Sequence, residues 1–422
     1  MTKPHFVDRQ QNFWQLASIQ ASGISITGIL LGGHLTKQYG AGQALIAVII
    51  GNLILWIIGL IIIAMSAQGR KNAIENVNKY FGRGGGIMMS LILVVAFISW
   101  YMLEIQMTTA AISGYSQAYL QWSPSASVRI GVVLGLITAL LSIGGIRLIK
   151  HLCVASFPIL FLFTVYSIGI ETKPVVWEGT WGISFPAITV VATLILPGTV
   201  NLPTFFRHSR SLADSFLALT LMYIFYTLFF SFSIFVGISD PAEIITKYAG
   251  NSMASAYVFF AFVFVILSMF CLNLQNIYFA SAGWEMIFPQ RSSQKEYAIV
   301  GLLGTAAYTF FQLTSPMIFI ENLTDSFIIT LGISLFIGFL VKVVLQRRMR
   351  FHERFINNTC WLFGCLIAGI ALAYNPSSSI QAIALSVFGT IFLFICIFII
   401  EETRWAVKRV VLKEGENNIL SK

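Results

Sequence analysis

An acidic side chain stands in the middle of a long apolar stretch of the sequence. Glu104 belongs to the segment AFISWYMLEIQMTTAA, and if that segment crosses a bilayer, burying its carboxylate costs several kcal/mol. Acids at such a depth usually serve in ion coupling or substrate binding, and a structural hydrogen bond to a neighbouring helix is the alternative. Trp100 lies four residues earlier and therefore on the same helix face. Together the two side chains could stack on a flat ring and hydrogen-bond to its edge.

A cluster of amides occurs in a second apolar stretch, LNLQNIYFASAG. Asn273 and Asn276 share roughly one helix face, and Gln275 lies beside them. Amides placed so closely are too polar to face lipid, and they could bind the edge of a polar ring or hydrogen-bond between helices. We expect Asn273 and Asn276 to bind a substrate.

No residue pattern points to catalysis or to a bound metal. The histidines lack metal-ligand spacing, no serine and histidine combine with an acid in a nucleophile motif, and no glycine-rich phosphate loop follows a strand. We therefore expect no catalytic residue, no metal and no organic cofactor. The five cysteines all fall in apolar segments, which is typical of small buried residues and not of a disulfide framework.

Two of the apolar stretches that would position these residues are interrupted. Residues 186–210 contain Pro197-Gly198 and then Pro203, and proline removes a backbone donor and clashes with the preceding helical turn. Residues 18–33 carry glycines and serines in place of leucines. A plain proline kink could explain the former stretch alone, but two interrupted segments at corresponding places predict inverted repeats with substrate held between the breaks. The residues expected to bind substrate there are Ser22, Gly23, Gly198 and Thr199.

The composition is that of a membrane protein. Of the 422 residues, 57% are hydrophobic and only 10% are charged, which excludes an ordinary soluble protein. In a soluble chain the net charge of +9 would suggest a nucleic-acid partner. Cytoplasmic loops explain it better here, so we expect a lipid bilayer and no nucleic acid.

Hydropathy predicts twelve membrane-spanning helices. They lie near residues 15–37, 43–66, 87–119, 128–146, 150–170, 185–206, 213–238, 254–282, 298–314, 317–341, 359–375 and 380–400. With both termini in the cytoplasm, 22 of the 26 lysines and arginines fall on the cytoplasmic side, as the positive-inside rule requires. We therefore expect a multi-pass protein of the plasma (inner) membrane.

The twelve spans form a single transport domain over residues 1–422. Spans 1–5 and 6–10 run in opposite directions, and between spans 2 and 3 an amphipathic surface helix is predicted, ended by glycines. Glu321 and Asp325 open span 10 either as gate residues or as a solvated helix start. The predicted parts are repeat one (15–170), repeat two (185–341), accessory packing or oligomer helices (359–400) and a cytoplasmic tail (401–422).

Several stretches resemble the nucleobase–cation symporter family, which contains cytosine, allantoin and hydantoin permeases. They are GILLGGHL, YGAGQALIAVIIGNLILWIIGL, ISWYMLEIQ, NLPTFFRHSRSLAD and NLQNIYFASAG, within spans 1 to 8. The resemblance implies the leucine-transporter fold, transport driven by sodium or protons, and a binding site between helices 1, 3, 6 and 8. It also implies that Trp100 stacks on the substrate ring, while Asn276 or Asn273 bonds to the edge of the ring.

The chain departs from that family's pattern in three places. The family commonly has glutamine where this chain has Glu104, an aromatic near the helix 6 break where 194–196 reads LIL, and in its sodium-coupled members a Ser-Thr pair where 270–272 reads FCL. The side chains of 270–272 supply no oxygen ligands for a hard cation such as sodium. We therefore favour protons over sodium as the coupling ion, with Glu104 as the carrier and Ser25 and Ser268 as further coupling residues.

We interpret the sequence as that of a secondary active transporter that imports a nucleobase or related heteroaromatic by alternating access. Cytosine is the first expected substrate, because an acid facing the ring suits an edge that bears N–H donors. The alternative is the same fold carrying a cationic amine or an amino acid, with Glu104 as counter-ion. A membrane sensor or enzyme is a more remote alternative, and the oligomeric state is left open.

Overall fold

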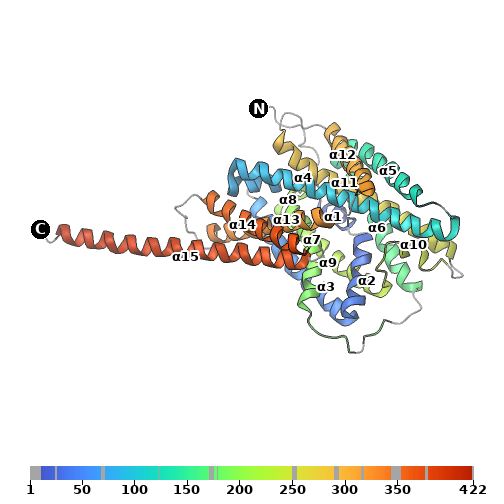
Figure 1. The fold of residues 1–422 in the computed structure, drawn as a ribbon, viewed down its shortest axis with the longest axis horizontal. Helices are drawn as coiled ribbons and strands as arrows, with labels where there is room; N and C mark the ends of the chain where they lie inside the picture. The colour runs from blue at the N-terminus through green and yellow to red at the C-terminus, as the bar shows by residue number, and fades with distance from the viewer. Residues whose placement is uncertain are drawn as a thin grey trace.

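The computed structural model is a bundle of α-helices (Figure 1). It describes residues 11–420 apart from 24–25, 68–71, 122, 171–174, 178, 250–253, 289–293, 315–317, 344–352 and 376–378. Within these described ranges there is no β-strand, and one isolated parallel bridge joins Gln11 to Ser209. The all-helical fold predicted from the sequence is confirmed.

Fifteen α-helices follow one another along the described chain, with a π-helical turn (Ser116–Leu120) and a 3-10 turn (Ser142–Gly144) between them. They are α1 (Phe13–Ala21), α2 (Ile26–Tyr39), α3 (Ala41–Ala67), α4 (Ala73–Tyr115), α5 (Pro124–Leu141), α6 (Gly145–Ile170), α7 (Phe185–Asn201), α8 (Pro203–Phe206), α9 (Leu212–Val236), α10 (Glu243–Thr246), α11 (Ala254–Ile287), α12 (Gln294–Thr314), α13 (Ile318–Val343), α14 (Glu353–Tyr374) and α15 (Ser379–Leu420). α15 extends far beyond the body of the bundle (Figure 1).

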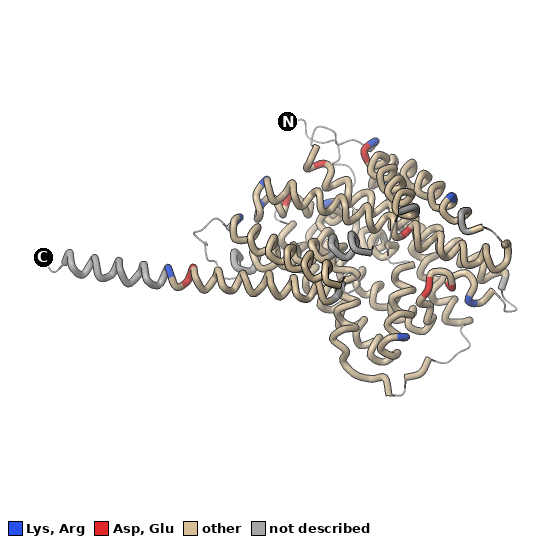
Figure 2. The backbone as a smooth tube through the Cα atoms, in the orientation of Figure 1, with Lys and Arg blue, Asp and Glu red and all other residues tan. Residues whose placement is uncertain are grey.

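Helices lie at each of the twelve predicted spans. Among the described residues, length and hydropathy select eight helices able to cross a membrane, or nine if α1 and α2 are counted as one bent span. Most of the described charged residues lie at helix ends and in connecting segments, which leaves the helix middles apolar (Figure 2). The protein is therefore a multi-pass membrane protein, while the count of twelve and the inverted repeat stay predictions.

The first predicted break is present in the structure. α1 and α2 meet at an angle of 61°, and Gly23 lies at the junction. A Cβ atom built on Gly23 would lie 3.1 Å from the amide group of Gln275. The glycine therefore lets the side chain of Gln275 approach the backbone of the break closely.

The second break lies just after Pro197-Gly198. α7 remains helical through Pro197 and Gly198 and ends at Asn201, and α8 begins at Pro203. The interruption therefore lies within the predicted stretch 186–210, about one turn after Pro197-Gly198. Proline at this place removes only one helical hydrogen bond, and the Asn201 side-chain amide donates to the Pro197 carbonyl oxygen at 3.0 Å. The second part of the stretch, α8, starts at Pro203, the other proline singled out in the sequence.

The predicted amphipathic helix before span 3 forms the first part of α4, over residues 73–81. Gly82 ends it with φ 77° and ψ 177°, a conformation open to glycine and costly for other residues. Two side-chain amides of α14 cap its last turn, because Asn357 donates to the Tyr80 carbonyl oxygen at 3.1 Å and Asn358 to that of Phe81 at 2.9 Å. The helix thus packs on α14, one of the two accessory helices.

Candidate substrate site

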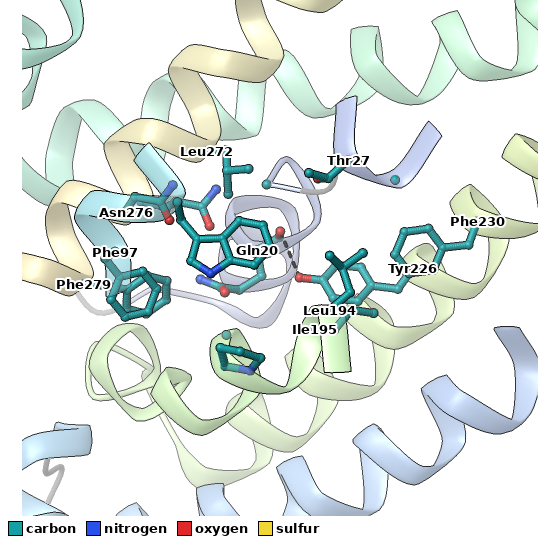
Figure 3. Close-up of a pocket in the computed structure, with 16 residues that line it drawn as sticks. Gln20, Thr27, Phe97, Leu194, Ile195, Tyr226, Phe230, Leu272, Asn276 and Phe279 are labelled. Carbon is teal, nitrogen blue, oxygen red and sulfur yellow. Dashed lines mark hydrogen bonds between the residues drawn. The ribbon is translucent and has the colours of Figure 1, made fainter. Parts of the chain in front are cut away.

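A cavity of about 100 Å³ lies where the first break meets the second half of α7 (Figure 3). Its walls come from α1, α2, α4, α7, α9 and α11, so distant parts of the sequence converge on it. The lining residues are Gln20, Gly23, Thr27, Gly28, Phe97, Trp100, Leu194, Ile195, Pro197, Gly198, Tyr226, Phe230, Leu272, Gln275, Asn276 and Phe279. This position between interrupted helices is where transporters built from repeats hold their substrates.

Aromatic rings form much of the surface of the cavity. Phe97 and Phe279 stack with their ring centroids 4.7 Å apart, and this contact joins α4 to α11. Tyr226 and Phe230 add rings from α9, and Trp100 adds an indole from α4. Flat apolar walls of this kind suit a planar ring, because aromatic groups gain energy from stacking in addition to burial.

Amide groups supply the polar part of the lining. Gln20 is only 5% exposed, and its Nε2 has no hydrogen-bond partner among the residues that the structure describes. Asn276 is 3% exposed, and its Nδ2 lies 3.4 Å from Oδ1 of Asn273, to which it donates. A buried donor without a partner is costly. A ligand with a hydrogen-bond acceptor would relieve that cost at Gln20.

Four of the predicted substrate residues line the cavity together, namely Trp100, Asn276, Gly23 and Gly198. A Cβ atom built on Gly198 would meet no atom within 4 Å, so the α7 backbone is open there. Leu194 and Ile195, which stand where the family often has an aromatic, also line the cavity, as aliphatic wall residues. Aromatic rings near these two residues come instead from α9, whose Tyr226 and Phe230 also line the cavity (Figure 3).

The other predicted residues lie outside the described lining. Asn273 is fully buried behind Asn276, as the hydrogen bond between them shows. Ser22 donates to the Ile19 carbonyl oxygen at 2.8 Å, and Thr199 is within 2.5 Å of the Tyr223 hydroxyl, toward α9. Both hydroxyl groups thus bond to the protein itself.

The predicted ion-coupling residues fall in three different places. Glu104 is fully buried on α4, one helical turn beyond Trp100, and is not among the described lining residues. Ser268 accepts a hydrogen bond from the Ile26 amide at 3.1 Å, at the start of α2. Ser25, like the side chains of Glu321 and Asp325, lies outside the described residues.

Sequence reasoning missed Gln20 and underrated Gln275, which it noted only as a neighbour of the asparagines. Both line the cavity at the first break. Gln20 carried a signal, since it is the one amide in the interrupted segment SIQASG. The rings of Tyr226 and Phe230 carried none, because α9 is rich in aromatics along its whole length.

A polar cluster of Arg207, His208 and Tyr278 lies next to the aromatic wall of the cavity. Phe279 packs against Phe205 of α8 at 5.0 Å between ring centroids. Beyond it, the Tyr278 hydroxyl lies 2.7 Å from Nε2 of His208 and accepts from the Arg207 guanidinium at 3.1 Å. Burial, together with the adjacent positive charge of Arg207, lowers the pKa of His208 to about 3, so its imidazole is neutral at pH 7.

The segment before α1 is tied to this cluster by backbone hydrogen bonds. The Gln11 amide donates to the His208 carbonyl oxygen at 2.7 Å, and the Arg210 amide donates to the Gln11 carbonyl oxygen at 3.1 Å. These two bonds form the isolated parallel bridge between Gln11 and Ser209. These bonds hold the segment before α1 beside the segment after α8.

The fold as a whole is that of membrane transporters. Mhp1, a nucleobase-cation-symport-1 family transporter solved in a closed conformation with bromovinylhydantoin bound, superposes with a TM-score of 0.67 at 17% identity, over 96% of this chain and 94% of that chain. A Na⁺-coupled sialic acid symporter in a substrate-bound outward-open state gives 0.64 at 14% identity, over 91% and 88%. A manganese transporter from Eremococcus coleocola gives 0.58 at 14% identity, over 93% and 95%.

No protein-family model matches the chain, and no curated protein matches it in sequence. The resemblance to the nucleobase–cation symporters noted from the sequence is confirmed at the level of the fold. These likenesses show a shared fold.

Proposed function

We propose that this protein is a secondary active transporter that imports a nucleobase or related flat heteroaromatic by alternating access, coupled to a cation. The observation that carries the proposal is the cavity at the first helix break, where aromatic walls and buried amides occur together. Aromatic walls recognise the face of a planar ring, and amides recognise its edge. The fold shared with several symporters supports the transport mechanism.

Each part of the substrate has a proposed partner in the cavity. Trp100 and the stacked pair of Phe97 and Phe279 cover the ring face. Gln20 and Asn276 bond to the ring edge. An amide both donates and accepts, so these two side chains suit cytosine, whose edge carries an amino group, a ring nitrogen and a carbonyl oxygen.

Glu104 has a different proposed role from direct contact with the ring. It is fully buried one turn beyond Trp100, and a carboxylate is costly at such a place unless it is protonated or its charge is balanced. We assign it the coupling proton, taken up and released as access to the cavity alternates. Substrate and proton are then coupled along one face of α4.

The described lining also favours a neutral ring over the cationic amine considered from the sequence. None of the described lining residues is charged, and an organic cation enclosed there would lack an adjacent counter-ion. The proposal further places the protein in the plasma (inner) membrane with both termini in the cytoplasm and with repeats over residues 15–170 and 185–341. The charge distribution of the sequence supports this orientation.

The test is uptake of radiolabelled cytosine into liposomes that contain the protein, with sodium and proton gradients imposed separately. Unlabelled purines, pyrimidines, hydantoin, thiamine and amino acids are added as competitors. We expect uptake that is driven by the proton gradient and blocked by nucleobases. Competition by amines or amino acids alone would refute the substrate class, and uptake driven by sodium at constant pH would refute proton coupling.

A further inference from the structure

The carbonyl groups at the end of α1 are the natural place for a cation. The last turn of a helix carries carbonyls that lack intrahelical partners, together with the negative end of the helix dipole. In a membrane helix broken near its middle, such carbonyls coordinate coupling ions. α1 ends at Ala21 and α2 begins at Ile26, so the carbonyls of residues 18–21 lie next to this break. Those of Ser18 and Gln20 each accept a backbone amide bond at 3.0 Å, from Ser22 and Gly23.

In this protein neutral side-chain donors bond to two of those carbonyls. The Gln275 amide donates from Nε2 to the Ile19 carbonyl oxygen at 2.8 Å, and the Ser22 hydroxyl donates to the same oxygen at 2.8 Å. The Tyr226 hydroxyl donates to the Gln20 carbonyl oxygen at 3.2 Å. The donors come from α11, α9 and the break itself, so they join three elements at one point.

Gln275 is held in this position from several sides. It is 2% exposed, its Nε2 lies 3.4 Å from the Ser22 hydroxyl oxygen, and the absence of a side chain at Gly23 leaves it room. Its Nε2 also lies 3.9 Å from Sγ of Cys153, and that thiol lies 4.0 Å from the Cys271 carbonyl oxygen. Thiols are soft ligands that suit hard cations poorly.

We propose that the side-chain amide of Gln275 takes the place of a coupling cation at the first helix break, so that no sodium ion binds there. Its N–H group meets the Ile19 carbonyl as a metal ion would, but it carries no net charge and stays with α11. The inference rests on the proposed function and deepens it. A fixed side chain of the protein fills the place of an ion at the break, and Glu104 alone carries the coupling charge. Gln275 is thus a positioning residue that determines ion specificity.

The experiment replaces the amide with a carboxylate of the same shape and uses sodium itself as the probe. In Gln275→Glu a carboxylate oxygen faces the Ile19 carbonyl oxygen, and a cation bound between them would relieve the repulsion. The melting temperature of the purified protein in detergent is measured at pH 8 in sodium chloride and in choline chloride of equal ionic strength. We expect no difference for the parent protein and a sodium-specific rise of roughly 2–5 °C for Gln275→Glu.

Asn52→Asp is the matched control. Asn52 of α3 is also buried, and its amide donates to the Val48 carbonyl oxygen at 2.9 Å within a continuous helix. The same chemical change there should bring no sodium response. If Gln275→Glu does not fold, the pair Cys271→Thr with Gln275→Ala takes its place, since it removes the amide and adds an oxygen ligand.

Two results would overturn the inference. One is a sodium-specific stabilisation of the parent protein that the substitution at Gln275 changes, because sodium would then bind at the break in the presence of the amide. The other is the lack of any sodium response in the substituted protein. Because the probe is sodium and not a substrate, both outcomes are independent of whether the uptake assay finds a nucleobase.

Discussion

A buried amide donor without a partner destabilises the protein while the cavity is empty. When a ligand with an acceptor fills the cavity, the same donor can form a hydrogen bond that stabilises the complex. The Nε2 group of Gln20 is in this state among the described residues. We predict that Gln20→Leu raises the melting temperature of the substrate-free protein, because the unsatisfied donor costs about 1–3 kcal/mol. The same change should weaken cytosine binding about tenfold, since one hydrogen bond to the ring is lost. Thermal melts and equilibrium binding on one preparation check both effects, and unchanged affinity would remove Gln20 from the site.

Stacking on Trp100 is the contact expected to contribute most to ring binding. We predict that Trp100→Ala lowers cytosine affinity at least about tenfold while the protein stays folded, because both the stacking energy and the burial of the ring face are lost. Equilibrium binding measures the effect. Trp181→Ala is the control, since Trp181 is 60% exposed outside the cavity. Full affinity in Trp100→Ala would place the substrate elsewhere.

The carboxyl group of Glu104 is the proposed proton carrier. Glu104→Gln keeps the shape of the side chain and removes its ability to titrate, so we predict that substrate still binds but that accumulation no longer depends on external pH. Accumulation is measured in cells or liposomes at external pH values from about 5.5 to about 8. Exposed Glu243, substituted in the same way, serves as control. A pH dependence equal to that of the parent protein would exclude Glu104 as the coupling group.

At the level of elements, the cluster around Tyr278 makes a prediction about acid stability. The pKa of His208 is lowered to about 3 in the folded protein, against about 6.5 in an unfolded chain. The unfolded state therefore binds more protons between these values, and the contribution of His208 to stability is present above pH 6.5 and lost progressively as the pH falls toward 3. Melting temperatures should fall across this window.

The variant His208→Gln separates this residue from other titrating groups. Glutamine can still bond to the Tyr278 hydroxyl but takes up no proton, so we expect its melting temperature to decline less steeply with acid than that of the parent protein. The comparison uses detergent-purified protein at matched ionic strength from about pH 7.5, above the predicted window, to about pH 5, inside it. Equal slopes for the two proteins would show that His208 is not buried in its neutral form.

The elements also show how far sequence reasoning reached. Helix positions followed from hydropathy, and the glycine end of the helix over residues 73–81 followed from local chemistry. That α7 continues past Pro197 did not follow, because this depends on the side chain of Asn201 and on packing partners far away in the sequence. In the same way, the spacing of Trp100 and Glu104 predicted that they share a helix face. It could not predict that the described lining of the cavity includes Trp100 and not Glu104.

At the scale of the whole molecule, the orientation in the membrane remains to be tested. With 22 of 26 lysines and arginines assigned to one side, we predict that both termini lie in the cytoplasm. A fluorescent protein that matures only in the cytoplasm should be bright when fused to the C-terminus. Alkaline phosphatase inserted near Gly182, between α6 and α7, should be active. Activity of the two reporters in the opposite pattern would invert the topology.

The bridge between Gln11 and Ser209 adds a free-energy cost to any separation of the segments that it joins. Any rearrangement that separates the start of α1 from the segment after α8 must break two backbone hydrogen bonds, each with a net contribution of about 0.5–1.5 kcal/mol. Because this net value already includes replacement of the bonds by water, the separated form is disfavoured by about 1–3 kcal/mol from this source alone, or roughly 5- to 150-fold in population. A bridge of two residues can thus make the separated state rare at rest yet accessible within the energy that substrate binding supplies.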